Sequence, residues 1–223
     1  MESFLYSIDV AIFRWVNQGW SNPIFDKFFS FITDYHNFLP LIIPFILYSL
    51  IWGGAKGRWL VLSLVLGILI ADQGSGTFLK SWVERLRPCN TLDGVLTPVG
   101  KSEAYSFPSS HASNMGASMY LLSMAFRPWT PLFLVIAFLV GLSRIYLGLH
   151  YPSDVLTGYA FGILVGYCVW LAVEKMKVAV KDSFSPSPLG FEGTQGVSLV
   201  NASRETGKLK AKAKGRKVAR KKR

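Results

Sequence analysis

The chain has 223 residues, of which 51% are hydrophobic, and its mean hydropathy of +0.33 is high for a soluble domain. Its formal net charge of +11 comes from the C-terminal part, because residues 1–174 carry ten Lys and Arg against ten Asp and Glu, whereas residues 175–223 carry fourteen against three. These numbers argue against a soluble globular enzyme and favour a membrane protein with a basic tail.

The N-terminal 36 residues predict two amphipathic helices at the membrane interface. Residues 4–16 place their large apolar side chains on one helical face, with Asp9 outside that face. A second helix is expected after Asn22, which can cap it, with Pro23 at its first position. Both segments are too polar to span a bilayer, and we expect no removable signal peptide.

Five longer apolar runs follow, each near the roughly 20 residues that a helical span needs. They cover residues 37–53, 59–80, 108–126, 129–149 and 152–173. The sequence therefore predicts an all-α integral membrane bundle over residues 37–176, with about five spans. In the last run Gly158, Gly162 and Gly166 are spaced by four, which predicts close packing between helices.

Polar residues interrupt these runs at particular ends. If the chain threads back and forth, the end of the second run, the start of the third, the end of the fourth and the start of the fifth lie on one side of the membrane. Polar groups within membrane segments are costly and mark functional sites. The pattern therefore predicts one shared site near one interface.

The other side of the membrane receives Lys56, Arg58, Arg127 and the tail, residues 177–223. The positive-inside rule places that side in the cytoplasm, so the shared site is expected to face the extracytoplasmic side of the cell (inner) membrane. The tail is expected to be disordered and solvated, or to contact anionic lipid headgroups. No nucleic-acid partner is expected.

Three sequence clusters bring reactive side chains to the predicted shared side. They are KSWVERLRP (Lys80–Pro88), PSSH (Pro108–His111) and SRIYLGLHYPSD (Ser143–Asp154). Lys80 and Arg87 supply positive charge, and Arg144 adds a planar fork of donors suited to phosphate. Ser109 and Ser110 lie where a helix is expected to begin, so their hydroxyls and the free backbone N–H groups favour an anion.

Two histidines complete the predicted site. His150 and Asp154 are four residues apart, and a helix that begins near Pro152 can turn the carboxylate toward the imidazole. This pairing would fix the tautomer and leave the other ring nitrogen free to attack. His111 is placed to donate a proton. Together with the cations, these groups describe in-line phosphoryl transfer.

The three clusters resemble the pattern K-x6-R-P, P-S-x-H, S-R-x5-H-x3-D of the type 2 phosphatidic acid phosphatase family. The resemblance covers Lys80–Asp154 and implies a lipid phosphatase that uses a phosphohistidine intermediate, with no metal and no other cofactor. It implies that His150 is the nucleophile, that Asp154 orients it and that His111 protonates the leaving group. The implied phosphate ligands are Lys80, Arg87, Ser109, Ser110 and Arg144. Ser110 departs from the family, in which many members have glycine.

The architecture looks most like bacterial undecaprenyl diphosphate phosphatases, which makes undecaprenyl diphosphate the expected substrate. Phosphatidylglycerophosphate, phosphatidic acid and lipid A stay open as alternatives. Vanadate-dependent haloperoxidases share the same oxyanion site, but their members are soluble. A non-enzymatic lipid-phosphate binder is the alternative from another class.

Plainer interpretations also stay open for several residues. Arg85 and Glu84 are interpreted as a pair or as water-facing side chains. Asp72 and Gln73 are expected to make polar contacts between helices, or otherwise to line the substrate pocket. Ser109 can cap a helix, and a cap and a phosphate site use the same geometry.

Overall fold

The computed structural model describes residues 4–184, and every regular element in that range is helical. Two helices form the N-terminal part: α1 (Phe4–Asn17) and α2 (Pro23–Thr33). The others are η1 (Tyr35–Phe38), α3 (Leu39–Ile51), α4 (Gly54–Gln73), η2 (Gly74–Leu79), α5 (Lys80–Val83), α6 (Pro88–Thr91), α7 (Ser110–Ala125), η3 (Arg127–Trp129), α8 (Thr130–Tyr146) and α9 (Pro152–Phe184). The all-α prediction is confirmed for the described residues.

The described residues up to Lys177 form one compact unit, and residues 178–184 belong to a second. Helix α9 continues to Phe184, past the predicted boundary at residue 176. The remainder of the predicted basic tail, residues 185–223, lies outside the described residues.

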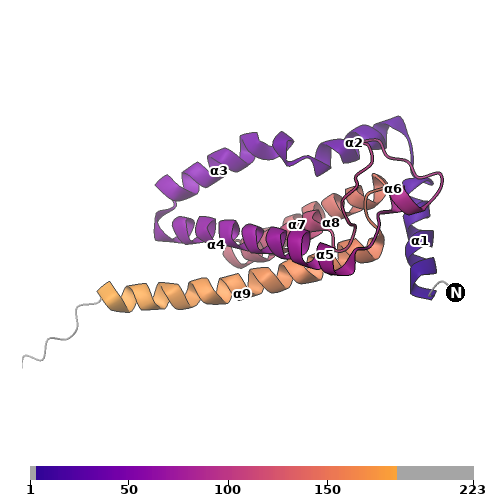
Figure 1. Ribbon diagram of the computed structural model, residues 1–223. Helices are drawn as coiled ribbons and strands as arrows, with labels where there is room; N and C mark the ends of the chain where they lie inside the picture. The colour runs from indigo at the N-terminus through magenta and orange to yellow at the C-terminus, as the bar shows by residue number, and fades with distance from the viewer. Residues whose placement is uncertain (1–3, 185–223) are drawn as a thin grey trace, which may run out of the picture. The chain divides into compact units, whose positions relative to one another are not determined.

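Helices α4, α7, α8 and the first part of α9 run side by side and form the core of the first unit (Figure 1). Helix α7 lies between α4 and α8 and packs on both. The amide of Asn114 on α7 donates to the carboxylate of Asp72 on α4 at 3.0 Å, which is the predicted polar contact between helices. Small buried residues such as Ala71 and Ala117 allow the helices to approach closely.

Glycines of α9 let that helix lie directly against α7, as their spacing predicted. A Cβ atom on Gly158 would lie 2.6 Å from the carbonyl oxygen of Ser109, closer than real Cβ contacts. At Gly162 the same atom would collide with the backbone of Ser113. The start of α9, which carries Asp154, is therefore held against the start of α7.

Three segments are long and apolar enough to cross a membrane: Gly54–Thr91, Arg127–Tyr146 and Pro152–Lys181. The pair α2 and η1–α3 can add a fourth, bent by 70° at its break. Helix α7 has only 16 residues and falls short of that length. All five predicted runs are helical, and the described residues contain three or four candidate spans, close to the predicted number of about five.

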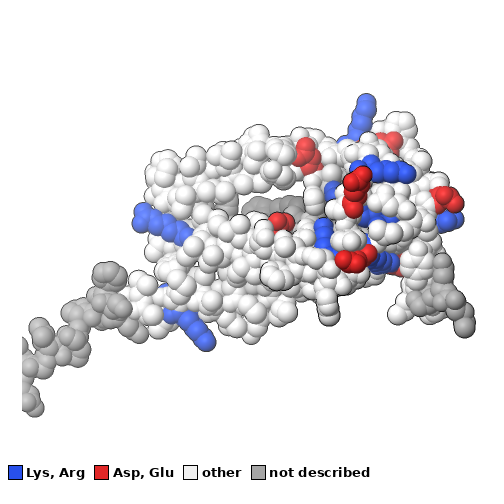
Figure 2. Space-filling model, in the orientation of Figure 1, with Lys and Arg blue, Asp and Glu red and all other residues white. Residues whose placement is uncertain are grey.

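The distribution of charge fits a bilayer around the helical core. In the face shown in Figure 2, charged side chains gather at the end of the unit where α2, α5 and α6 lie, and the body of the helices is mostly uncharged. Large apolar side chains there are exposed, including Leu69, Phe138 and Leu164. Such a surface is compatible with lipid.

The two N-terminal helices expose apolar side chains, as the predicted interfacial helices would. On α1, Leu5 and Trp15 are exposed, whereas Phe13 and Asp9 on the other face are buried. Helix α2 begins as predicted, because the side-chain oxygen of Asn22 accepts hydrogen bonds from the first backbone N–H groups. Both helices pack against α8.

Candidate active site

The three sequence clusters come together where four segments of the bundle end. Lys80 begins α5 directly after the π-helical segment η2, and Arg87 immediately precedes α6. Arg144 lies in the last turn of α8, and His150 lies between α8 and α9. The remaining predicted residues open helices: Ser109, Ser110 and His111 at the start of α7, and Asp154 in the first turn of α9.

Charged groups from all these segments act on one another electrostatically. The His111 ring lies within electrostatic range of Arg144, His150, Lys80 and Arg87. Backbone contacts join the segments as well, since the Ser109 N–H donates to the Asp154 carbonyl at 3.0 Å. The structure therefore brings the predicted residues into one region, as the threading of the chain required.

His150 lies on a buried turn that Arg87 and Arg144, two of the predicted phosphate ligands, help to form. Its side chain is almost fully buried, and its backbone N–H donates to the carbonyl of Arg144 at 3.2 Å. The guanidinium of Arg87 donates to the neighbouring carbonyl of Leu149 at 3.4 Å and to that of Ala104 at 2.7 Å. Gly148 has a φ of 78°, which favours glycine and allows the sharp turn after α8.

Asp154 approaches His150 as predicted, but the contact is shared with a third residue. Oδ2 of Asp154 lies 3.7 Å from Nδ1 of His150, which is too long for a hydrogen bond. The hydroxyl of Ser106 donates to the same Oδ2 at 2.5 Å and lies 3.4 Å from Nδ1. Ser106 is fully buried. The carboxylate is therefore linked to the imidazole through the hydroxyl of Ser106.

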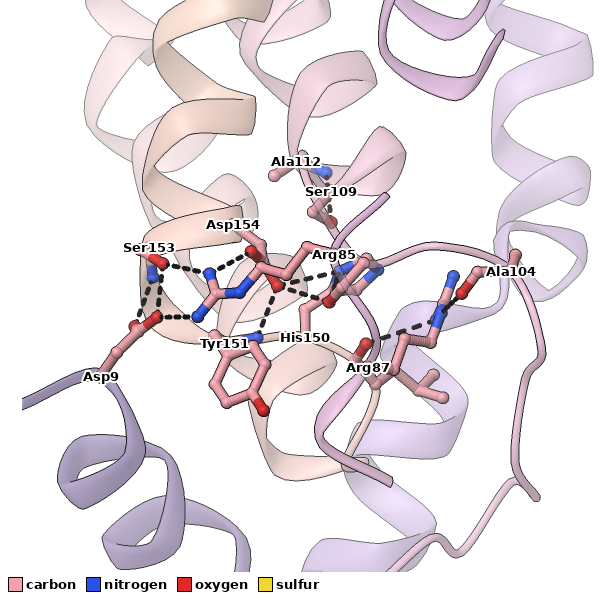
Figure 3. A network of polar contacts seen from close by, with 12 residues as sticks. Asp9, Arg85, Arg87, Ala104, Ser109, Ala112, His150, Tyr151, Ser153 and Asp154 are labelled. Atoms are coloured by element: carbon pink, nitrogen blue, oxygen red, sulfur yellow. Dashed lines mark hydrogen bonds and ion pairs between the residues drawn. The ribbon is translucent and has the colours of Figure 1, made fainter. Parts of the chain in front are cut away.

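Further contacts hold Asp154 from the other side, as Figure 3 shows. Oδ2 also accepts from the backbone N–H of Tyr151 at 2.8 Å, and Oδ1 accepts from the guanidinium of Arg85 at 2.7 Å. Arg85 in turn donates to Asp9 of α1 at 2.6 Å and lies over the ring of Tyr151, with Cζ 4.0 Å from the ring centroid. The interpretation of Arg85 as a partner of Glu84 or a water-facing side chain was therefore wrong, because it pairs with two buried carboxylates.

The sequence analysis missed four residues of this network: Asp9, Arg85, Ser106 and Ser153. Ser106 lies in a segment without periodicity, so no pattern pointed to it. Asp9 lies 145 positions before Asp154, and only its place opposite the apolar face of α1 set it apart. Arg85 lies within the first cluster, where its motif position carries no assigned role.

Two of the predicted phosphate ligands carry a donor that has no hydrogen-bond partner among the described residues. These buried atoms are Nε of Arg144 and Oγ of Ser110. Another nitrogen of the Arg144 guanidinium donates to the hydroxyl of Thr33 in α2 at 2.7 Å, which fixes the orientation of the guanidinium. Ser109 caps α7, its hydroxyl accepting from the backbone N–H of Ala112 at 3.4 Å. Buried donors without partners are costly unless a ligand accepts from them, so these two atoms suit an anion.

Burial keeps the imidazole of His150 neutral at neutral pH. It lowers the pKa of His150 to about 4, and Arg87 and Arg144 act in the same direction, whereas Asp154 opposes them. A neutral imidazole whose Nδ1 faces Asp154 and Ser106 leaves Nε2 with a free electron pair. That atom is the one available for nucleophilic attack.

Comparison with known proteins places the chain in a family. A model of the PAP2 superfamily matches residues 56–177, more than half of the chain. The lipid A 4'-phosphatase of Bacteroides thetaiotaomicron is 31% identical over 198 residues, which cover 84% of this chain and 86% of that protein. Phosphatidylglycerophosphatase B of Bacillus subtilis is 32% identical over 154 residues, 62% of this chain and 69% of that protein.

Two solved structures share the architecture. The crystal structure of Aquifex aeolicus LpxE matches with a TM-score of 0.59 and 25% identity, covering 73% of this chain and 94% of that one. A PAP2-type phosphatidylglycerolphosphate phosphatase from Bacillus subtilis matches with a TM-score of 0.59 and 27% identity, covering 78% and 89%. The chain therefore belongs to the PAP2 superfamily, as its three motifs predicted, and is a multi-pass membrane lipid phosphatase.

Proposed function

We propose that the protein removes phosphate from undecaprenyl diphosphate through a phosphohistidine on His150. The observation that carries this proposal is the buried, neutral imidazole of His150, which lies near Arg87 and Arg144 and has its Nδ1 turned toward Asp154. Lys80, Arg87 and Arg144 together match the roughly three negative charges of a lipid diphosphate.

The proposed reaction has two steps. Nε2 of His150 attacks the terminal phosphorus, the bond from phosphorus to the bridging oxygen breaks, and His111 gives its proton to the departing undecaprenyl phosphate. Water then gives a proton to His111 and attacks the phosphohistidine, so that inorganic phosphate leaves and His150 is restored. In both steps Arg87, Arg144, Ser110 and the N-terminal N–H groups of α7 stabilise the charge on the equatorial oxygens.

We also propose an orientation for the site. Lys56, Arg58 and Arg127 lie at the ends of helices remote from the reactive clusters along the chain, and the positive-inside rule assigns those ends to the cytoplasm. The active site then faces the extracytoplasmic side of the cell (inner) membrane, with the C-terminus in the cytoplasm. The tail remains a candidate for contact with anionic lipids.

A second substrate is favoured by the relatives. The two lipid A 4'-phosphatases match 84% and 75% of this chain, so the 4'-phosphate of lipid A is the main alternative. Other relatives are named for phosphatidylglycerophosphate and for decaprenylphosphoryl-5-phosphoribose. All of these lipids present phosphate on an apolar anchor.

A panel assay separates these substrates. Purified protein in detergent, without divalent metal, is given undecaprenyl diphosphate, lipid A, phosphatidylglycerophosphate and phosphatidic acid, and released inorganic phosphate is measured. We expect the highest kcat/KM for undecaprenyl diphosphate and no release by His150→Ala. A higher kcat/KM for lipid A would contradict the substrate, and equal release by His150→Ala would contradict the mechanism.

A further inference from the structure

Asp9 is a buried acid on a helix whose other face is apolar. Helix α1 exposes Leu5, Ile12 and Trp15, whereas the Asp9 side chain is only 7% exposed. Burying a carboxylate is costly unless it is paired and hydrogen-bonded. The hydrogen bonds of Asp9 therefore indicate its role in the protein.

The hydrogen bonds of Asp9 connect it to Arg85 and Ser153, which both lie next to Asp154. Oδ2 accepts from the guanidinium of Arg85 at 2.6 Å and from the hydroxyl of Ser153 at 2.5 Å, and Oδ1 accepts from the Ser153 N–H at 2.9 Å. Ser153 immediately precedes Asp154, and the other arm of Arg85 holds Asp154 and the Ser153 hydroxyl, both at 2.7 Å. Figure 3 shows Arg85 lying between the two carboxylates.

In this arrangement one guanidinium, that of Arg85, pairs with two carboxylates. Asp9 and Asp154 together carry two negative charges against the single charge of Arg85, so the three side chains sum to one negative charge. When His150 attacks phosphorus, its ring gains positive charge, which that excess balances. Such a fixed charge in a buried site stabilises a transition state without the cost of reorganising water.

Helix α1 has attachments to the rest of the protein other than Asp9. The amide nitrogen of Asn17 donates to the carbonyls of Leu96 at 2.8 Å and Tyr146 at 2.6 Å, and its oxygen accepts from the Leu96 N–H at 3.0 Å. Phe13 is fully buried on the same face. These contacts keep α1 in place when the carboxylate is removed.

We propose that Asp9 is a positioning residue for catalysis: it shares Arg85 with Asp154, so that Asp154 keeps the orientation and the negative charge that His150 needs. Without Asp9, Arg85 would pair with Asp154 alone and neutralise it. The proposal rests on the proposed role of His150 as the nucleophile.

The test removes the negative charge of Asp9 while keeping the size of its side chain. Asp9→Asn, Asp9→Glu and His150→Ala are assayed as full-length protein in detergent, with release of inorganic phosphate from undecaprenyl diphosphate and from dioctanoyl phosphatidic acid. We expect Asp9→Asn to lower kcat about 10- to 100-fold, as loss of a supporting partner does at other sites, with KM within about twofold of the wild type. Asp9→Glu should restore most of kcat.

Asp26→Asn is the matched control. Asp26 is also a carboxylate on an N-terminal helix, and it accepts from the hydroxyl of Tyr146 at 2.6 Å, but it does not contact Arg85. We expect Asp26→Asn to keep the wild-type kcat. Arg85→Lys provides a second variant if Asp9→Asn does not fold, because an ammonium group cannot make the forked contact, and about a tenfold lower kcat is expected.

The outcomes separate the two proposals. Wild-type kcat in folded Asp9→Asn or Arg85→Lys would overturn the role of Asp9, as would an Asp9→Glu variant as slow as Asp9→Asn. A raised KM with unchanged kcat would also overturn it, because Asp9 would then act on substrate binding. If His150→Ala keeps its activity, the proposed function itself fails, whatever the Asp9 variants show.

Discussion

At the scale of single residues, the protonation of His150 decides when the enzyme can work. Burial next to Arg87 and Arg144 lowers the pKa of His150 to about 4, below the ordinary value of about 6.5 for this side chain. A lowered pKa means that the neutral, nucleophilic form dominates above about pH 4. Only below that pH does protonation remove the electron pair from Nε2.

This protonation predicts an unusually acidic lower limit for activity in the dependence of kcat/KM on pH. We expect activity to be retained at pH 5 and lost as the pH approaches 4, where the imidazole of His150 becomes protonated. The measurement is kcat/KM from pH 4 to 9 in detergent, with folding followed by tryptophan fluorescence at each pH. An acidic limb centred near pH 6.5 would show that His150 is not held neutral by burial.

The residues that could be predicted are those whose chemistry shows in their spacing. His150 and Asp154 are four residues apart at a helix start, and Lys80 and Arg87 lie at the two ends of one short segment. The chemical type and the spacing of these four side chains therefore pointed to one site. Ser106 and Asp9 could not be predicted, because their roles come from tertiary packing that joins distant segments. Such contacts leave no local period in the sequence.

At the scale of helices, the site depends on how closely α9 approaches α7. Gly158 lies in the second turn of α9, and its missing side chain leaves room for the carbonyl of Ser109. The Ser109 N–H bonds the Asp154 carbonyl at 3.0 Å in the same region. The sequence predicted this packing from glycine spacing, whereas the buried face of α1 was not predicted, since its apolar face pointed to the membrane.

Gly158→Ala is therefore expected to weaken both stability and activity. A Cβ atom 2.6 Å from the Ser109 carbonyl must push the helices apart, at a cost of about 1–3 kcal/mol. We expect a lower Tm in detergent and a reduced kcat, because Asp154 moves away from Ser109. Leu156→Met, at an exposed position of the same helix, serves as the control and should change neither value. An unchanged Tm for Gly158→Ala would mean that the close approach is not required.

At the scale of the whole molecule, the distribution of charge relates the active site to the membrane. In the catalytic clusters Arg85 binds two carboxylates, whereas the excess of positive charge in the chain lies in residues 175–223. Lys and Arg close to the ends of membrane spans are retained in the cytoplasm. The proposed orientation follows from that difference.

Labelling with a membrane-impermeant maleimide tests this orientation in intact cells. Lys101→Cys places a thiol at an exposed position of the loop before α7, and Ser203→Cys places one in the tail. Cys168 is exposed on α9 and is replaced by serine, whereas Cys89 is buried. We expect Lys101→Cys to react in intact cells, and Ser203→Cys to react only after the membrane is permeabilised, because the basic tail is held inside. The reverse pattern would place the active site in the cytoplasm, where it would meet lipid phosphates of the inner leaflet instead.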